Sequence, residues 1–149
     1  MPEFPAIARA INHELDRLFP EPIEILAEPG RFMVATAATA VTKIIGRAVR
    51  DGKLCYFVDD GVYHTFSGIA FDHCQYPIKS FKEGETKISA VYGPTCDDMD
   101  HMVGPFMLPS DVKAGDYIEI GMLGAYGAAM RTGFNGFTSE STIEVEDEP

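Results

Sequence analysis

Residues 92–100, with the sequence YGPTCDDMD, place a thiol beside carboxylates on a turn. Cys96 is followed directly by Asp97, and Gly93-Pro94 ends any strand that reaches this point. A cysteine nucleophile usually needs a positively charged neighbour, whereas adjacent carboxylates favour the protonated thiol. A protonated thiol can donate a proton, and a carboxylate beside it can bind a cationic amine. The stretch therefore predicts a proton donor beside an ammonium-binding group, with a solvated loop as the alternative.

Two further motifs contain groups suited to a polar or anionic ligand. In EPGR, Gly30 allows the backbone to come close to a ligand, and Arg31 offers a planar fork of donors for a phosphate or a carboxylate. Glu28 in the same motif could bond a ring nitrogen or a cation. In GAYG, the phenol of Tyr126 is flanked by small residues and can reach a ligand oxygen. From the residues alone, a surface ion pair and a buried tyrosine with a satisfied hydroxyl remain alternatives.

The spacing of the other candidate ligands argues against a metal site. FDHC, residues 71–74, brings an aspartate, a histidine and a cysteine together in sequence. Consecutive side chains of a strand point to opposite faces, so these three do not converge. No two of the four histidines have a spacing typical of a metal-ligand pair. We therefore expect no zinc site.

Composition and charge narrow the class of protein. A chain of 149 residues is long enough for one domain with a sizeable core. The net charge of -11 and the scattered basic residues argue against nucleic-acid binding. Three widely spaced cysteines are typical of free thiols in a reducing compartment. Neither a signal peptide nor an apolar run long enough to span a membrane is visible, so the cytoplasm is the expected location.

The chain is expected to begin with one helix–strand unit and to continue as a mainly β fold of the α+β class. Apolar residues at helical spacing predict a helix over residues 5–19, and residues 23–27 favour a strand. An isolated unit of this kind cannot bury both faces of its strand, so we expect the chain to begin inside a larger α/β domain. Asp51-Gly52 predicts a hairpin turn. The predicted later strands cover residues 32–50, 53–63, 86–93, 101–108 and 116–123, with a short helical piece at 65–74.

The motifs occur in an order that is typical of a known family: EPGR at 28–31, YFVDDGVYHTFSGIAFDH at 56–73, YGPTCDDMD at 92–100, and GAYG followed by FNGF at 124–137. On these motifs the chain resembles the C-terminal part of the pyridoxal-phosphate (PLP) dependent decarboxylases of the ornithine decarboxylase type, which share a fold with alanine racemase. The resemblance implies a C-terminal β-barrel or sandwich domain over residues 32–140. It further implies that residues 1–31 are one helix and one strand of a truncated (β/α)8 barrel, and that residues 141–149 are an acidic tail.

The resemblance also implies roles around PLP. Glu28 would pair with the pyridine nitrogen, which strengthens the ring as an electron sink. Arg31, with the backbone of Gly30 and with Pro29 in the same motif, would hold the phosphate group. Tyr126 would add a hydroxyl to the same phosphate. The lysine that binds PLP covalently lies before EPGR in the family, and no lysine of this chain precedes that motif.

Roles at the substrate follow from the same resemblance. Asp72, beside Phe71, would meet the distal amine of a diamino acid, and Asp97 would do so from the other subunit of a head-to-tail homodimer. Cys96 would protonate the substrate carbon after carbon dioxide leaves. Phe134 would line the pocket at the dimer interface.

The form of the motifs points to a branch of the family. The aspartate after the cysteine and the ending FNGF resemble ornithine or lysine decarboxylase rather than the diaminopimelate branch. The expected function is that of the C-terminal portion of a decarboxylase that converts a basic amino acid, ornithine or lysine, to a diamine in polyamine biosynthesis. Because the PLP-binding lysine is absent, we expect the chain alone to be inactive. The alternative is a stand-alone non-catalytic homologue that pairs with or regulates a decarboxylase.

Overall fold

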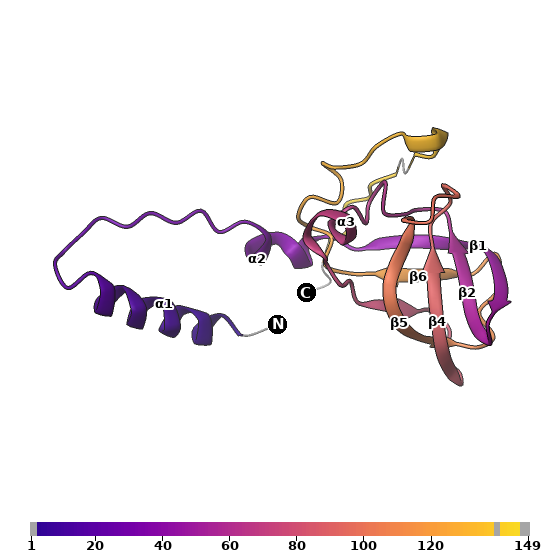
Figure 1. Cartoon of the computed structure of the whole chain (residues 1–149), viewed down its shortest axis with the longest axis horizontal. Coiled ribbons are helices and arrows are strands. Elements are labelled where there is room, and N and C mark those ends of the chain that lie inside the picture. Colours follow the sequence, from indigo (N-terminus) through magenta and orange to yellow (C-terminus); the bar gives the residue numbers. More distant parts are fainter. Residues whose placement is uncertain (1–2, 139–140, 147–149) are drawn as a thin grey trace.

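Six strands form one curled sheet in the computed structural model, which describes residues 3–138 and 141–146 (Figure 1). The strands are β1 (Ala40–Arg50), β2 (Lys53–Val58), β3 (Ile78–Ser80), β4 (Thr86–Tyr92), β5 (His101–Pro109) and β6 (Tyr117–Ile120). Their order across the sheet is β3-β6-β1-β2-β4-β5. The edge strands β3 and β5 also contact each other, so the sheet curls into a half-barrel. The helical segments are α1 (Phe4–Leu18), α2 (Arg31–Val34), α3 (Gly68–Asp72) and the 3-10 turns η1 (Ala35–Ala37) and η2 (Phe134–Gly136).

The long strand β1 joins the two halves of the sheet. Its first half pairs antiparallel with β6, and its second half pairs antiparallel with β2. The register shifts between Ile44 and Gly46, and an irregularity of this kind bends and twists a strand. The hairpin to β2 turns at Asp51 and Gly52, whose φ angles are 49° and 75°, as a two-residue turn of the primed type requires. The mainly β fold and the predicted hairpin are therefore confirmed.

The core lies on the inner side of the curl. Successive residues of a strand point to opposite faces, and in β1 the buried Thr42 and Ile44 alternate with exposed neighbours. Tyr56 crosses this core, and its hydroxyl donates a hydrogen bond to the carbonyl of Pro109 at 3.1 Å. Burial raises the pKa of this hydroxyl above its usual value. Among the largest fully buried side chains are Tyr56, Phe66, Ile44, Leu108, Ile118 and Ile120.

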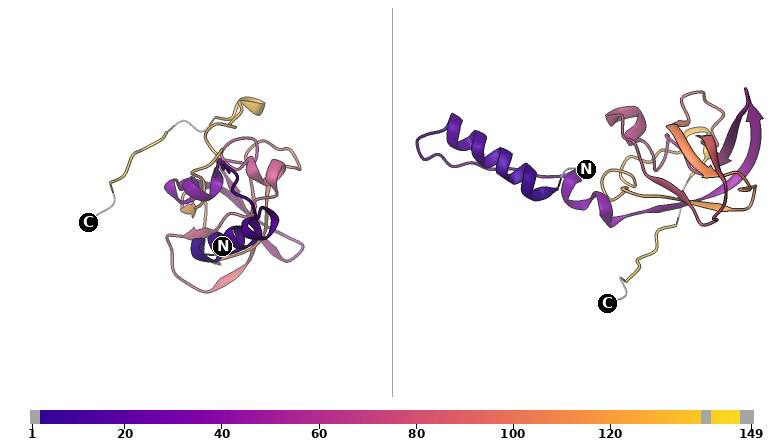
Figure 2. Two further views of the ribbon diagram at one scale, coloured as in Figure 1. Left: turned by 90° about the vertical axis from the view of Figure 1, so that its left-hand side faces the viewer. Right: turned by 90° about the horizontal axis from the view of Figure 1, so that it is seen from below.

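The N-terminal segment stands apart from the sheet, as Figures 1 and 2 show. α1 confirms the predicted helix to within one residue at each end. Pro5 lies in its first turn, where proline costs no hydrogen bond because backbone amides there have no partner within the helix. None of its residues is buried, and Leu26 in the segment that follows is 85% exposed. The predicted strand over residues 23–27 is wrong, because these described residues are irregular. A strand needs a neighbouring strand for its backbone groups, and this part of the chain has none beside it.

The predicted strand over residues 32–50 is wrong over its first part. α2 and η1 occupy residues 31–37, and β1 begins only at Ala40. Carbonyl groups of this segment accept hydrogen bonds from the backbone after β6. The amide of Leu123 donates to the carbonyl of Ala38 at 2.9 Å, and the amide of Gly124 donates to the carbonyl of Ala35 at 3.0 Å. This tertiary contact outweighs the strand preference of the β-branched residues in the segment.

Two other strands are shorter than predicted. β2 ends before Asp59 rather than at residue 63, because Asp59 turns back onto β1. Its Oδ1 accepts hydrogen bonds from the Thr42 hydroxyl at 2.6 Å and the Lys43 amide at 2.9 Å. β6 ends early, at Ile120. β4 and β5 match their predicted ranges to within one residue, α3 lies in the predicted helical piece, and β3 was not predicted.

Gly124 provides a test of the contact between α2–η1 and the backbone after β6. A methyl group at this position would overlap the carbonyl oxygen of Val34, so Gly124→Ala must push the two segments apart. Gly133 has nothing within 4 Å of the corresponding position, which makes Gly133→Ala the matched control. We expect Gly124→Ala to lower the free energy of unfolding by about 2 kcal/mol or more, and the control by less than about 0.5 kcal/mol. Denaturant unfolding measures both, and equal losses in the two variants would contradict the contact.

Candidate functional site

Arg31 is the centre of the first group of candidate side chains. It opens α2, and its Nη2 forms an ion pair with Oδ2 of Asp72 in α3. The guanidinium carbon lies 5.1 Å from the centroid of the Tyr126 ring, which is within cation–π range. A methyl group on Gly30 would lie 3.2 Å from the Tyr126 hydroxyl, so this hydroxyl is close to the backbone of EPGR. Three motifs therefore meet here, and Gly30, Arg31, Asp72 and Tyr126 are called the Arg31 group below.

The charged members of the Arg31 group remain accessible. The side chains of Arg31 and Asp72 are 31% and 51% exposed, so a ligand from solvent can reach both. A guanidinium has five N–H donors, so Arg31 can bind an anionic group while it stays paired with Asp72. Burial raises the pKa of the nearby Tyr76 hydroxyl, Cys74 adds to the rise, and the positive charge of Arg31 opposes it. The arrangement suits a phosphate or a carboxylate.

Three predicted residues border the Arg31 group. Glu28 and Pro29 precede α2 on an exposed irregular segment. Phe71 lies in α3 directly before Asp72 and is 68% exposed. Their position along the chain places them beside the group, and their exposure leaves their side chains accessible to a ligand or to another chain.

The second group of candidate side chains begins on the loop of residues 92–100 between β4 and β5. The amide of Gly93 donates to the carbonyl of Asp100 at 2.8 Å, which closes the loop. Cys96 is exposed and has a φ of 60°. Its Sγ lies 4.0 Å from the carbonyl oxygen of Pro94, a contact in which a protonated thiol is a weak donor. The fold therefore presents the thiol of Cys96 to the surface.

Asp97 is held from two sides. Its Oδ1 accepts a hydrogen bond from the amide of Met99 at 2.9 Å. Its carboxylate also interacts with the hydroxyl of Tyr63, and burial and this interaction together raise the pKa of Tyr63. The ring of Tyr63 stacks on that of Phe134, with 4.3 Å between the centroids. Tyr63 thus links Asp97 to Phe134, and Tyr63, Cys96, Asp97 and Phe134 are called the Cys96 group below.

Tyr63 and Asn135 were not among the predicted site residues. The carbonyl of Tyr63 accepts hydrogen bonds from the amide of Thr132 at 3.1 Å and from its hydroxyl at 2.8 Å. The Nδ2 of Asn135 donates to the carbonyl of Thr95 at 3.0 Å, which ties FNGF to the loop that carries Cys96. Both residues lie inside the family motifs, and this position could have identified them as candidate site residues. Their pairing across the fold could not be read from spacing.

The two groups occupy separate places. Among the described residues, no hydrogen bond or ion pair joins the Arg31 group to the Cys96 group. Each group contains accessible side chains, such as Asp72 in the first and Cys96 in the second. The described residues therefore contain two sets of accessible candidate side chains that no hydrogen bond or ion pair connects.

The described part of the chain offers few other places for chemistry. Over residues 3–138 and 141–146, no group of three or more His, Cys, Asp or Glu side chains is placed to hold a metal ion. Within the same ranges, no helix is both long enough and apolar enough to cross a lipid bilayer. The cysteines Cys55, Cys74 and Cys96 are all free thiols.

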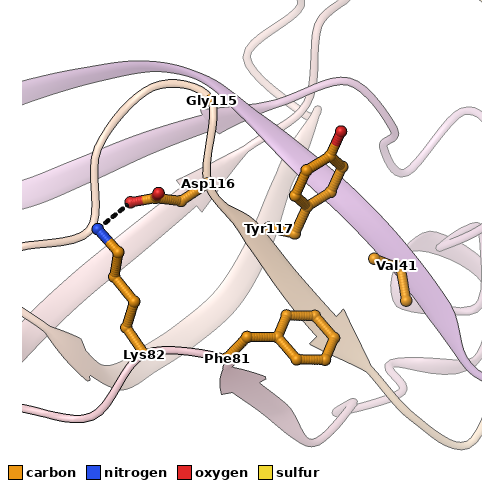
Figure 3. A pocket seen from close by; sticks show the side chains of 6 residues that line it. All are labelled: Val41, Phe81, Lys82, Gly115, Asp116 and Tyr117. Atoms are coloured by element: carbon orange, nitrogen blue, oxygen red, sulfur yellow. Dashed lines mark ion pairs between the residues drawn. The ribbon is translucent and has the colours of Figure 1, made fainter.

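A cavity of about 470 Å³ lies away from both groups, on β1, β6 and the segment after β3 (Figure 3). At one side of it Lys82 and Asp116 form an ion pair of 2.7 Å. Their hydrogen bond lowers the pKa of Asp116 and raises that of Lys82. None of the residues that line the cavity belongs to the four motifs. The accessible charged groups of Arg31 and Asp72 come together at the motifs instead, so the motifs are the better candidate site. The cavity is lined by Val41, Phe81, Lys82, Gly115, Asp116 and Tyr117.

Most of this chain is similar to parts of known proteins. Residues 31–124 match the family model described as "Pyridoxal-dependent decarboxylase, C-terminal sheet domain". The chain is 42% identical to the lysine/ornithine decarboxylase of Selenomonas ruminantium over 97% of this chain and 36% of that protein. The structure of lysine/ornithine decarboxylase complexed with cadaverine from Vibrio vulnificus is similar with a TM-score of 0.79 and 41% identity, covering 92% of this chain and 37% of that chain. A structure of SrLDC in complex with PLP and cadaverine has a TM-score of 0.83 and 40% identity, covering 99% of this chain and 38% of that chain. The chain thus spans little more than a third of the length of these relatives.

The contact between Tyr63 and Asp97 predicts the outcome of a titration. Burial and the nearby carboxylate of Asp97 raise the pKa of Tyr63, because both disfavour the phenolate. Asp97→Asn removes the negative charge, so the pKa of Tyr63 should fall toward the usual value for tyrosine. Carbon-13 NMR of labelled tyrosine rings at alkaline pH measures this shift. Asp98→Asn is the control, since the charge of Asp98 raises the pKa of Tyr63 less than that of Asp97 does. An equally large fall in that variant would refute the contact.

Proposed function

Because the chain belongs to the pyridoxal-dependent decarboxylase family and contains its C-terminal sheet domain, we propose that the protein carrying it converts ornithine or lysine to a diamine with PLP as cofactor. The observation that carries the proposal is the meeting of EPGR, α3 and GAYG at Arg31. The similarity to relatives named as lysine/ornithine decarboxylases supports the choice of substrate. The activity is that of the whole protein, of which the matched sheet domain is one part.

The Arg31 group fits the phosphate group of PLP. The guanidinium of Arg31 matches the geometry of phosphate oxygens, and the hydroxyl of Tyr126 lies where Gly30 leaves room beside the backbone. Glu28, with Pro29 between it and Gly30, would bond the pyridine nitrogen. PLP, when bound, supplies an electron sink for the electron pair of the bond to the departing carboxylate.

Asp72 would bind the distal ammonium of the substrate. Its Oδ2 pairs with Arg31, which leaves Oδ1 for a second cation. Phe71 lies beside it on α3 and is largely exposed, so it can cover the methylene chain of the substrate. A second carboxylate, Asp97, would bind the same ammonium, because an ammonium has three N–H donors and can bond two carboxylates at once.

Cys96 would deliver the proton that completes the reaction. The Sγ–H bond breaks while a C–H bond forms at the carbon that carbon dioxide has left, and the thiolate takes a proton back from solvent. The exposure of Cys96 allows that return. The stacked rings of Tyr63 and Phe134 would form a wall beside the thiol and limit the access of water to the reacting carbon.

The separation of the two groups supports a head-to-tail homodimer. Each centre would combine the Arg31 group of one protomer with the Cys96 group of its partner, as two-fold symmetry allows twice in one dimer. In this arrangement Phe134 would line the pocket at the interface. The three free thiols suit a reducing compartment such as the cytoplasm.

The division of the chain follows the same proposal. Residues 1–31 would belong to the barrel, residues 32–140 to the sheet domain, and residues 141–149 to an acidic tail. The separation of α1 from the sheet supports the first boundary. Residues 1–2, 139–140 and 147–149 of these ranges lie outside the described residues.

Replacement of Cys96 tests the proposed function. In the whole protein loaded with PLP, Cys96→Ala should slow the formation of diamine from ornithine or lysine by about 100-fold, within the range for loss of a positioned acid. A share of the turnovers should also end in an aldehyde and the amine form of the cofactor, because the proton then reaches the wrong carbon. Release of carbon dioxide and chromatography of the products measure both effects.

Cys74→Ala is the control, since Cys74 is a thiol outside the Cys96 group. It should leave the division between diamine and aldehyde unchanged. A wild-type protein that releases no carbon dioxide from either amino acid would refute the proposed function. An unchanged rate and product division in Cys96→Ala would refute the role of the thiol alone.

A further inference from the structure

Asp100 ends the loop that carries Cys96, and the proposed function gives it no role. Its side chain is 1% exposed, although it carries a carboxyl group beside two exposed loop residues. Burial of a carboxylate is unfavourable unless hydrogen-bond donors surround it. The donors that surround Asp100 therefore indicate what this residue does.

Three donors bind the carboxylate of Asp100. Its Oδ1 accepts a hydrogen bond from the amide of Val62 at 2.8 Å. Its Oδ2 accepts two from Thr95, one from the amide at 3.0 Å and one from the hydroxyl at 2.6 Å. Val62 belongs to the segment after β2, and Thr95 to the loop between β4 and β5. The single carboxylate thus joins two segments that are far apart in the sequence.

The backbone on either side is shaped to receive this carboxylate. A methyl group on Gly61 or on Gly93 would overlap the carboxylate of Asp100. The amide of Gly93 also donates to the carbonyl of Asp100 at 2.8 Å. The carboxylate is enclosed by backbone, so its position is fixed more closely than that of a surface ion pair.

The residues bound by Asp100 are neighbours of the Cys96 group. Thr95 directly precedes Cys96, and Val62 directly precedes Tyr63, whose hydroxyl interacts with Asp97. The amide of Asp100 itself donates to the carbonyl of Asp97 at 3.1 Å. The Sγ of Cys96 makes a long contact of 4.0 Å with the carbonyl oxygen of Pro94, so the position of the thiol depends on the backbone around it.

We propose that Asp100 is a positioning residue, whose buried carboxylate sets the placement of the Cys96 thiol and the Asp97 carboxylate relative to each other. The inference rests on the proposed function, because it concerns the proton donor and the ammonium-binding group of that reaction. Proton transfer to carbon and binding of the distal ammonium must occur on one substrate molecule. Small displacements of reacting groups slow a reaction strongly, so loosening this loop should disturb both steps.

Four variants of the whole protein separate positioning from general stability. Asp100→Asn keeps an oxygen for Val62 but places an amide group opposite the Thr95 donors. Thr95→Val removes the hydroxyl donor at nearly constant volume, and Thr95→Ser restores it. Asp98→Asn, at an exposed position in the same loop, is the matched control for loss of a negative charge.

The readouts are kcat, KM, the share of turnovers that end in an aldehyde, and hydrogen exchange of the Val62 and Thr95 amides. In Asp100→Asn we expect kcat to fall by about tenfold or more, KM to rise, the aldehyde share to increase and both amides to exchange faster. Thr95→Val should show smaller changes in the same direction. Thr95→Ser and Asp98→Asn should keep the wild-type product division.

All variants are compared at a temperature where circular dichroism shows them folded, and Thr95→Val provides the test if Asp100→Asn does not fold. A general loss of stability does not alter the division of products in the folded enzyme. Wild-type product division in folded Asp100→Asn, or in Thr95→Val where it is the test, would overturn the inference while leaving the proposed function intact. An inactive wild-type protein would overturn the proposed function and this inference with it.

Discussion

The close backbone contact at Gly124 is the constraint on which the candidate site depends. Because this residue has no side chain, the backbone after β6 comes close enough to α2–η1 for two amide-to-carbonyl hydrogen bonds. Arg31 lies at the start of α2, and Tyr126 lies just beyond the contact, so the guanidinium is brought against the phenol ring. The two groups proposed to bind the PLP phosphate therefore come from segments that this contact helps to hold together.

Carboxylates have two kinds of task in this acidic chain. Asp60 and Asp100 are buried and accept hydrogen bonds from backbone amides, so they order the loops after β2 and β4. Asp72 and Asp97 keep contact with solvent, so either can exchange water for a cation. Desolvation explains the division, because a buried carboxylate must find its donors within the fold. The buried pair provides structure, and the accessible pair is suited to the ammonium of a basic amino acid.

Helices and turns that depend on residues close together in the sequence were predicted well. The spacing of apolar residues found α1, and a two-residue turn signal found the hairpin. The strand predicted over residues 23–27 was wrong, because strand formation depends on partners that the sequence does not identify. The family motifs contained Arg31, Asp72 and Asp100. They did not indicate the ion pair of the first two or the hydrogen bonds that surround the third. These contacts join loops that meet only in the folded chain, so local spacing carries no information about them.

In the proposed dimer, the Arg31 group and the Cys96 group of one chain belong to different centres. Arg31→Ala and Cys96→Ala chains of the whole protein, with different affinity tags, can be co-produced and their mixed dimers purified. A head-to-tail arrangement places both substitutions in one centre and leaves the other intact, so the mixed dimer should recover about half of the wild-type decarboxylase activity. Mixed dimers no more active than the parent variants would contradict the head-to-tail arrangement, because every centre would then contain one of the two substitutions.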